Sequence, residues 1–146
     1  MAASEEIAAW DISISPDGNG LPEGSGTAVG GKSIYMEKCL VCHGQEGSGL
    51  LNDRLAGGHG TLGGPAPIKT VGSYWPYATT IFDYVRRAMP YLQPQTLSNE
   101  EVYALTAYLL FLNGIISEDE AMDAQTLPGV KMPNRDNFIL AYPGEN

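Results

Sequence analysis

The chain has 146 residues, 43% of them hydrophobic, which is typical of one folded domain with a modest core rather than of a disordered chain. Its 17 acidic and 8 basic residues give a formal net charge of −9. This charge argues against nucleic-acid binding, because an acidic surface repels phosphates, and it favours a basic protein partner.

The first 30 residues predict an extended N-terminal arm. Turn-forming residues crowd the segment between positions 16 and 26: Pro16, Asp17, Gly18, Gly20, Pro22, Gly24 and Gly26. The opening MAASEEIAAW has neither the basic nor the apolar region of a signal peptide. We therefore expect either a cytosolic protein or an exported one whose leader is not in this sequence.

Two helices and a long loop are predicted for residues 31–90. Side chains at spacings of three and four indicate a helix at about 31–43. Residues 44–70 are glycine-rich and lack periodicity, which is typical of a loop that carries function or wraps a ligand. A second helix is predicted from Thr79 or Thr80 to Met89, and Pro90 ends it because the residue before proline leaves the helical region.

The third predicted helix is the clearest element in the sequence. Ser98 and Glu101 form a capping box, an apolar stripe follows, and Asn113 with Gly114 closes the helix. Its apolar stretch falls short of the ~20 residues that cross a bilayer, so we expect no membrane span.

The tail predicts a second arm with little regular structure. Residues 117–146 begin with an acidic run and contain three prolines. No repeat or hairpin signal is present. The expected architecture is all-α, with an N-terminal arm at 1–30, a helical domain at 31–116 and a wrapping C-terminal arm at 117–146.

Both cysteines of the chain lie in one short motif, KCLVCHG at 38–44. The pattern C-x-x-C-H is typical of covalent haem attachment. One helical turn separates the two thiols by about the distance between the haem vinyl groups, to which each thiol adds. The histidine that follows lies under the iron. We therefore predict one haem c, held through Cys39 and Cys42 and ligated by His43.

Three other interpretations of the motif are weaker. A zinc site needs about four ligands, and only His59 remains. A thioredoxin-type pair would come with an alternating strand–helix pattern, which is absent. A disulfide between cysteines three residues apart is strained and rare. Because bacteria attach haem c to exported proteins, the motif also predicts a periplasmic location.

Five side chains could supply the sixth iron ligand: Met36, Met89, Met122, Met132 and His59. Met36 precedes Cys39 by one turn of the same helix and cannot reach the opposite face. Met122 lies in an acidic stretch and is expected to pack or to face solvent, and His59 is expected to be a solvated loop residue or a propionate partner.

Met89 and Met132 remain, and each precedes a proline that would hold its backbone extended. Met89 could instead be a core residue on its helix, and Met132 could cover the haem edge.

Other residues are candidates for the surroundings of the haem. Pro65 or Pro67 could offer a backbone carbonyl to the second nitrogen of the ligating histidine. Tyr74, Trp75 and Arg54 could meet the propionates, although the two aromatic rings could equally be core residues.

Arg86 and Arg87 end the second helix, where their charge suits the negative end of the helix dipole. They could also dock an acidic partner.

Gly31, Tyr35 and Cys39 follow one another at four-residue steps, and the last helix carries Leu105 and Tyr108. This pattern resembles class I c-type cytochromes, in which a glycine and an aromatic residue of the first helix cross a leucine and an aromatic residue of the last. The resemblance implies a class I cytochrome c fold, with three or more helices around one covalent haem. It also implies Met89, between the last two helices, as the distal ligand.

Longer strings narrow the resemblance: WDISISPDGNGLPEGSG, KTVGSYWPYATTIFDYVRRAMPYLQPQTLSNEEVYALTAYLLFLNGII and VKMPNRDNF. They are similar to the cytochrome subunit or domain of the sulfite and sulfane dehydrogenases of sulfur-oxidising bacteria, over about residues 7–140. Two departures stand out. The chain has a single haem motif where some relatives join two haem domains, and Asn137 stands where glycine is expected.

Together these features predict an electron carrier rather than an enzyme. Histidine with methionine closes the iron and raises its potential. The resemblance implies a dehydrogenase of sulfite or another sulfur compound as donor, and an oxidase or another cytochrome as acceptor. The alternative is a haem enzyme or sensor with an open distal site, acting on a sulfur oxyanion or a small oxidant. Tyr91 and Gln93 would be its distal polar groups.

Overall fold

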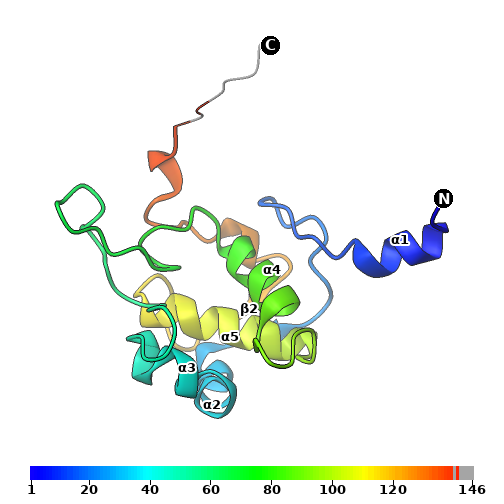
Figure 1. Ribbon diagram of the computed structural model, residues 1–146, viewed down its shortest axis with the longest axis horizontal. Coiled ribbons are helices and arrows are strands. Elements are labelled where there is room, and N and C mark those ends of the chain that lie inside the picture. Colours follow the sequence, from blue (N-terminus) through cyan, green and yellow to red (C-terminus); the bar gives the residue numbers. More distant parts are fainter. Residues whose placement is uncertain (140, 142–146) are drawn as a thin grey trace.

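The computed structural model describes residues 1–139 and 141. The described residues form five α-helices: α1 (Ser4–Trp10), α2 (Ala28–Lys38), α3 (Leu40–His43), α4 (Ala78–Ala88) and α5 (Asn99–Leu112). Two short strands, β1 (Ser25–Gly26) and β2 (Met122–Asp123), pair antiparallel, with Ser25 opposite Asp123. Three 3-10 turns complete the described elements: η1 (Gln45–Gly47), η2 (Leu127–Gly129) and η3 (Arg135–Asn137). The mostly helical fold confirms the predicted class (Figure 1).

The three predicted helices are present with small shifts at their ends. The first begins at Ala28 and breaks at Cys39, which separates α2 from α3. In α4, the residue after the helix is Met89, whose backbone is extended (φ −119°, ψ 149°), as expected before a proline. The capping box of α5 is confirmed. The Ser98 hydroxyl accepts from the Glu101 N–H (3.2 Å), and the Glu101 carboxylate accepts from the Ser98 N–H (2.8 Å).

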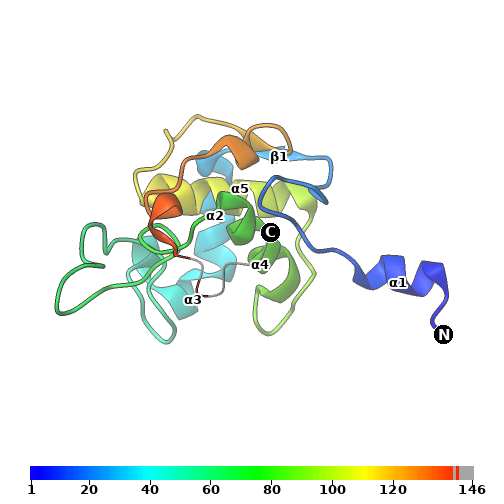
Figure 2. The same cartoon turned by 90° about the horizontal axis from the view of Figure 1, so that it is seen from above.

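Helices α2 and α5 cross closely in the centre of the molecule (Figure 2). A Cβ atom at Gly31 would overlap the carbonyl oxygen of Ala104 and lie 2.8 Å from Cβ of Tyr108. The rings of Tyr35 and Tyr108 fill the crossing with their centroids 5.2 Å apart. The predicted role of Gly31 is therefore confirmed: only a residue without a side chain lets these two backbones approach.

Helix α5 is the centre of the core. Every residue from Val102 to Leu110 is buried, and the rings of Phe82 in α4 and Tyr103 in α5 lie 4.4 Å apart. Within the described part of the chain, no helix has both the length and the apolar character needed to span a bilayer.

A buried asparagine ties the long loop to the end of α5. The Asn113 amide nitrogen donates to the carbonyls of Leu109 (2.8 Å) and Leu55 (3.2 Å), and its oxygen accepts from the Gly57 N–H (3.0 Å). Because all these groups are paired, the loop is fixed to the core on one side of α5.

The N-terminal arm is not extended throughout, contrary to the prediction. Residues Ser4–Trp10 form α1, and the Glu6 carboxylate accepts the Ala3 N–H at 2.7 Å. Glu5 and Glu6 lie in the first turn, where a negative charge suits the helix dipole. Both views place α1 apart from the other helices (Figures 1 and 2).

Most of the C-terminal arm contains only short elements, as predicted. Met122 and Met132 are each 1% exposed, so the arm packs its methionines into the core. Residues 140 and 142–146 of this predicted arm lie outside the described residues. The boundaries at 30/31 and 116/117 stay predictions.

The buried side chains of Tyr35 and Tyr103 should make the protein less stable at alkaline pH. Tyr35 donates to the Gly44 carbonyl and Tyr103 to the Pro22 carbonyl, both at 2.8 Å. Burial raises the pKa of each phenol to about 12. The unfolded chain releases these protons near pH 10, as a free tyrosine does, while the folded chain still holds them.

We therefore expect the free energy of unfolding to be intact below pH 10 and to fall between pH 10 and 12, by up to ~1.4 kcal/mol per pH unit for each phenol. Urea titrations across this range measure the slope. Tyr35→Phe should make it shallower, and an unchanged slope would show that this phenol does not contribute.

Candidate haem site

A cavity of about 460 Å³ lies between the α2–α3 segment, α4, α5 and the loops that join them. Its volume falls within the ~300–1,000 Å³ typical of cofactor and ligand pockets. The wall is mainly apolar, with aliphatic side chains from α4 and α5, including Ile81, Val85, Leu105 and Leu109. Both thiols of the chain, one imidazole and one thioether also line it, from Cys39, Cys42, His43 and Met89.

The break between α2 and α3 places the attachment motif on the cavity wall. The N–H groups of Cys42 and His43 both donate to the Cys39 carbonyl, at 3.1 Å and 2.9 Å, so the motif forms one tight turn. The two cysteines are half-buried and free, and no disulfide joins them. Burial raises the pKa of the Cys39 thiol to about 11.

The His43 ring is oriented by a backbone carbonyl. Its Nδ1 lies 2.9 Å from the carbonyl oxygen of Asp53. A carbonyl can only accept, so Nδ1 carries the proton and Nε2 keeps the lone pair that binds a metal. Such a partner fixes the tautomer and the orientation of a ligating imidazole.

The prediction that Pro65 or Pro67 supplies this carbonyl is wrong. Both prolines are exposed and neither lines the cavity. Instead the chain turns back directly after the motif. The Gly49 N–H donates to the His43 carbonyl (2.8 Å) and the Asn52 N–H to the Cys42 carbonyl (2.9 Å). This return brings the Asp53 carbonyl to the ring.

Of the five candidates for a distal ligand, all within the described residues, Met89 alone lines the cavity. It is half-buried and caps the C-terminus of α4. Met132 and Met122 are buried elsewhere in the core, Met36 is 48% exposed, and His59 is exposed in its loop.

Three basic side chains line the cavity, out of the eight in the chain: Lys38, Arg54 and Lys69. Such a concentration in a strongly acidic chain suits carboxylate groups of a bound cofactor. Arg54 and Trp75 line the cavity, and their contact with propionates stays a prediction. The Trp75 ring packs edge-on against Tyr84 at 5.6 Å.

Tyr74 does not reach the cavity. Its ring packs against Phe138 (5.5 Å) and lies under the Lys69 ammonium (4.8 Å). Sequence reasoning missed Lys69 as a cavity residue. It lies at the end of the long loop at 44–70, and only the folding of that loop brings its side chain to the cavity.

The arginines that end α4 do not line the cavity and have partners of their own. Arg87 pairs with Asp83 one turn earlier, and Arg86 donates to the Ile12 carbonyl at 3.4 Å. Both arginines therefore make specific contacts and do not only interact with solvent and the helix dipole.

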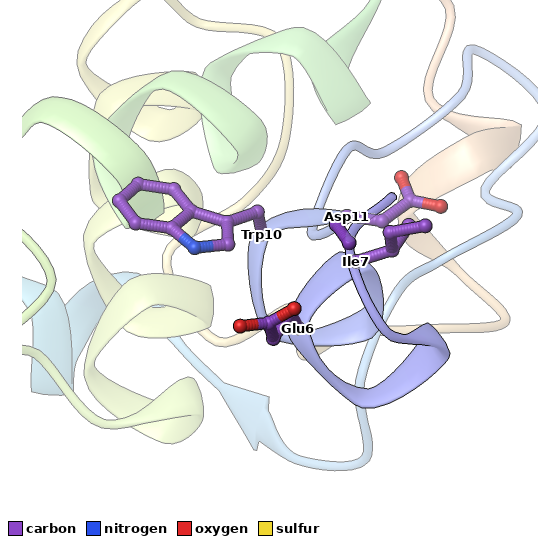
Figure 3. A pocket seen from close by; sticks show the side chains of 5 residues that line it. Glu6, Ile7, Trp10 and Asp11 are labelled. Carbon is purple, nitrogen blue, oxygen red and sulfur yellow. The ribbon is translucent and has the colours of Figure 1, made fainter.

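A second hollow, of about 560 Å³, lies beside α1 and is lined by Ala2, Glu6, Ile7, Trp10 and Asp11. Figure 3 shows the Trp10 ring extending away from the other labelled side chains. This hollow has no thiol, imidazole or thioether and offers haem no ligand. The described residues also contain no cluster of three or more His, Cys, Asp or Glu side chains that could hold a bare metal ion.

Comparisons with known proteins identify the family of the chain and several relatives. The family model described as cytochrome c oxidase, cbb3-type, subunit III matches residues 26–109. The chain is 27% identical over 114 residues to a thiosulfate dehydrogenase of Psychrobacter arcticus, covering 75% of this chain and 35% of that protein. It is 30% identical over 97 residues to a thiosulfate dehydrogenase of Allochromatium vinosum, covering 64% and 36%. The chain thus spans about a third of the length of these curated relatives.

A solved structure matches almost the whole chain. The crystal structure of the sulfane dehydrogenase SoxCD from Paracoccus pantotrophus superposes with a TM-score of 0.89 at 44% identity, covering 99% of this chain and 70% of that chain. The resemblance to cytochromes of sulfur-compound dehydrogenases is therefore confirmed. The family match extends over more than half of the residues and includes the Cys39–His43 motif, so the chain belongs to the cytochrome c family of the cbb3-type subunit III model.

Proposed function

We propose that this chain is a monohaem c-type cytochrome that transfers single electrons. Cys39 and Cys42 would hold the haem through thioether bonds, with His43 as the proximal ligand and Met89 as the distal one. The observation that carries the proposal is the single cavity that both thiols, an oriented imidazole and a thioether share.

The residues present fit the haem group. Bound haem supplies an iron that changes its charge by one electron. The chain's residues do the rest: the Asp53 carbonyl holds the imidazole proton on Nδ1, so that Nε2 is free to ligate. Lys38, Arg54 and Lys69 would offer positive partners to the propionates, and the aliphatic side chains would surround the macrocycle. An apolar wall and a thioether ligand both favour the reduced iron and so raise the potential.

We further propose that the protein works in the periplasm, between a dehydrogenase of sulfite or another sulfur compound and an oxidase or another cytochrome. The support is the activity named for its relatives, thiosulfate dehydrogenase and sulfane dehydrogenase. The net charge of −9 suits docking to a basic face of such a partner.

One specific observation favours a second candidate, a haem enzyme that acts on a sulfur oxyanion. Three basic side chains line the cavity, and an oxyanion would need such positive groups. This function requires an open distal position, which a bound Met89 would close. Whether the distal position of the iron is open or closed therefore distinguishes the two candidate functions.

We expect the oxidised protein to be reduced when a sulfite or sulfane dehydrogenase and its substrate are added. The rate should fall as salt is raised, because the acidic chain and its donor attract one another. Stopped-flow absorbance of the haem bands measures this rate, with substrate omitted as the control. If no reduction occurs on the turnover timescale of several such dehydrogenases, the assignment to sulfur metabolism is wrong.

A further inference from the structure

Helix α4 contacts the cavity on one face and the N-terminal arm on another. One faces the cavity and carries Ile81, Tyr84 and Val85, all of which line it. The other faces the N-terminal arm. There the Thr79 hydroxyl donates to the Pro16 carbonyl at 3.4 Å, near the start of the helix, and the Arg86 guanidinium donates to the Ile12 carbonyl at 3.4 Å, near its end.

Asp83 lies between these two contacts and makes the shortest of the three hydrogen bonds between α4 and the arm. Its residue is 8% exposed, and one carboxylate oxygen accepts the Ile14 N–H at 3.1 Å while the other binds Arg87. A buried carboxylate without partners is costly, so the arm and the helix hold each other in place. Ile14 also packs against the core, while Ser13 beside it is exposed.

The helix that the arm contacts ends directly before Met89. The Met89 N–H donates to the Val85 carbonyl at 3.1 Å, so Met89 continues from the last turn of α4. After Met89 the chain turns, with the Gln93 N–H donating to the Pro90 carbonyl at 2.8 Å, and residues 91–96 are all exposed. The Met89 backbone is therefore tied to the core side of the molecule through the last turn of α4.

We propose that residues 12–16 form a strap that holds α4 against the cavity, and that Asp83 is a positioning residue for the Met89 sulfur. This inference rests on the proposed role of Met89 as the distal ligand. When the strap is loosened, the end of α4 moves more freely and the iron becomes open to added ligands more often.

The test uses the haem-loaded, oxidised 146-residue chain with imidazole as the probe. Imidazole binds only when the distal position is open, so its apparent affinity reports the open fraction. We expect Asp83→Ala to tighten apparent imidazole binding about tenfold and to weaken the far-red sulfur-to-iron band. Asp83→Asn keeps an acceptor for the Ile14 N–H and should fall between Asp83→Ala and the wild type.

Asp17→Ala is the matched control. Asp17 lies on the same arm and its carboxylate accepts a backbone N–H, from Asn19 at 3.0 Å, so its loss changes the charge equally. Imidazole affinity should stay within twofold of the wild type. Arg86→Ala removes the bond to the Ile12 carbonyl at the other end of the strap, and it gives a second measurement if Asp83→Ala does not fold. We expect it to tighten imidazole binding several-fold.

The outcomes separate the two levels of inference. If the wild type lacks the far-red band, the Met89 assignment fails and the strap proposal fails with it. If the wild type has the band but neither Asp83→Ala nor Arg86→Ala changes imidazole affinity, the strap proposal alone is overturned. If these variants lower the unfolding midpoint but leave imidazole affinity unchanged, the strap proposal is also overturned, because Asp83 and Arg86 then contribute only to stability.

Discussion

Replacing Met89 by alanine is expected to abolish the far-red sulfur-to-iron band and to lower the reduction potential. Met89 alone among the five methionine and histidine candidates lines the cavity. Loss of the thioether removes a ligand that favours reduced iron, so the potential should fall by on the order of 0.1 V or more, within the ~0.8 V that axial ligands span. Absorption spectroscopy and redox titration measure both effects.

Met132→Ala is the matched comparison, because Met132 also precedes a proline and is 1% exposed in the core. It should keep the band and the potential while lowering the free energy of unfolding by about 2–5 kcal/mol, as expected for a buried methionine reduced to alanine. The reverse pattern, with the band lost only in Met132→Ala, would move the distal ligand to Met132.

Gly31→Ala is expected to destabilise the protein strongly. The added Cβ would overlap the Ala104 carbonyl oxygen, which belongs to the backbone of α5 and cannot turn away. The two helices would have to separate, at a cost of about 1–3 kcal/mol or more for overpacking a tight core contact. Urea unfolding of the haem-loaded protein measures the change.

Gly30→Ala provides a control of opposite sign on the same helix. The nearest atoms to a Cβ at Gly30 are the Ala104 Cβ at 3.8 Å and the Thr27 hydroxyl oxygen at 4.0 Å, so the methyl group fits. Alanine is the better helix former, and we expect a gain of about 0.5–1 kcal/mol. Equal effects of the two substitutions would contradict a close crossing at Gly31.

Features with a local chemical signature could be predicted from the sequence. The C-x-x-C-H spacing indicates its cofactor without any knowledge of the fold. The Ser98–Glu101 capping box marks the start of α5 because both of its bonds are made within four residues. Pro90 marks the end of α4 for a similar reason, since its effect acts on the residue before it.

Features that depend on distant parts of the chain could not be predicted in this way. Any residue can offer a backbone carbonyl to His43, and only the return of the loop selects Asp53. Met89 and Met132 have the same local signal, a proline that follows them. The family resemblance implied Met89, and the packing of α4 along the cavity gives the physical reason. Likewise, nothing local reveals that Asp83 bonds to the arm 69 residues away.

Helix α1 had a local signal, but the prediction did not include it. Glycine and proline dominate residues 16–26, and their turn signal was extended to the whole N-terminal arm. The two acidic residues of its first turn are the signal that could have revealed it.

The absorption spectrum of the oxidised wild-type protein, recorded into the far red, tests the central claim most directly. One covalent haem with His43 and Met89 as ligands predicts a low-spin spectrum with the weak sulfur-to-iron band. A high-spin spectrum would mean an open iron and would favour the haem enzyme. A low-spin spectrum without the band would mean that the distal ligand is a nitrogen and that Met89 does not bind the iron.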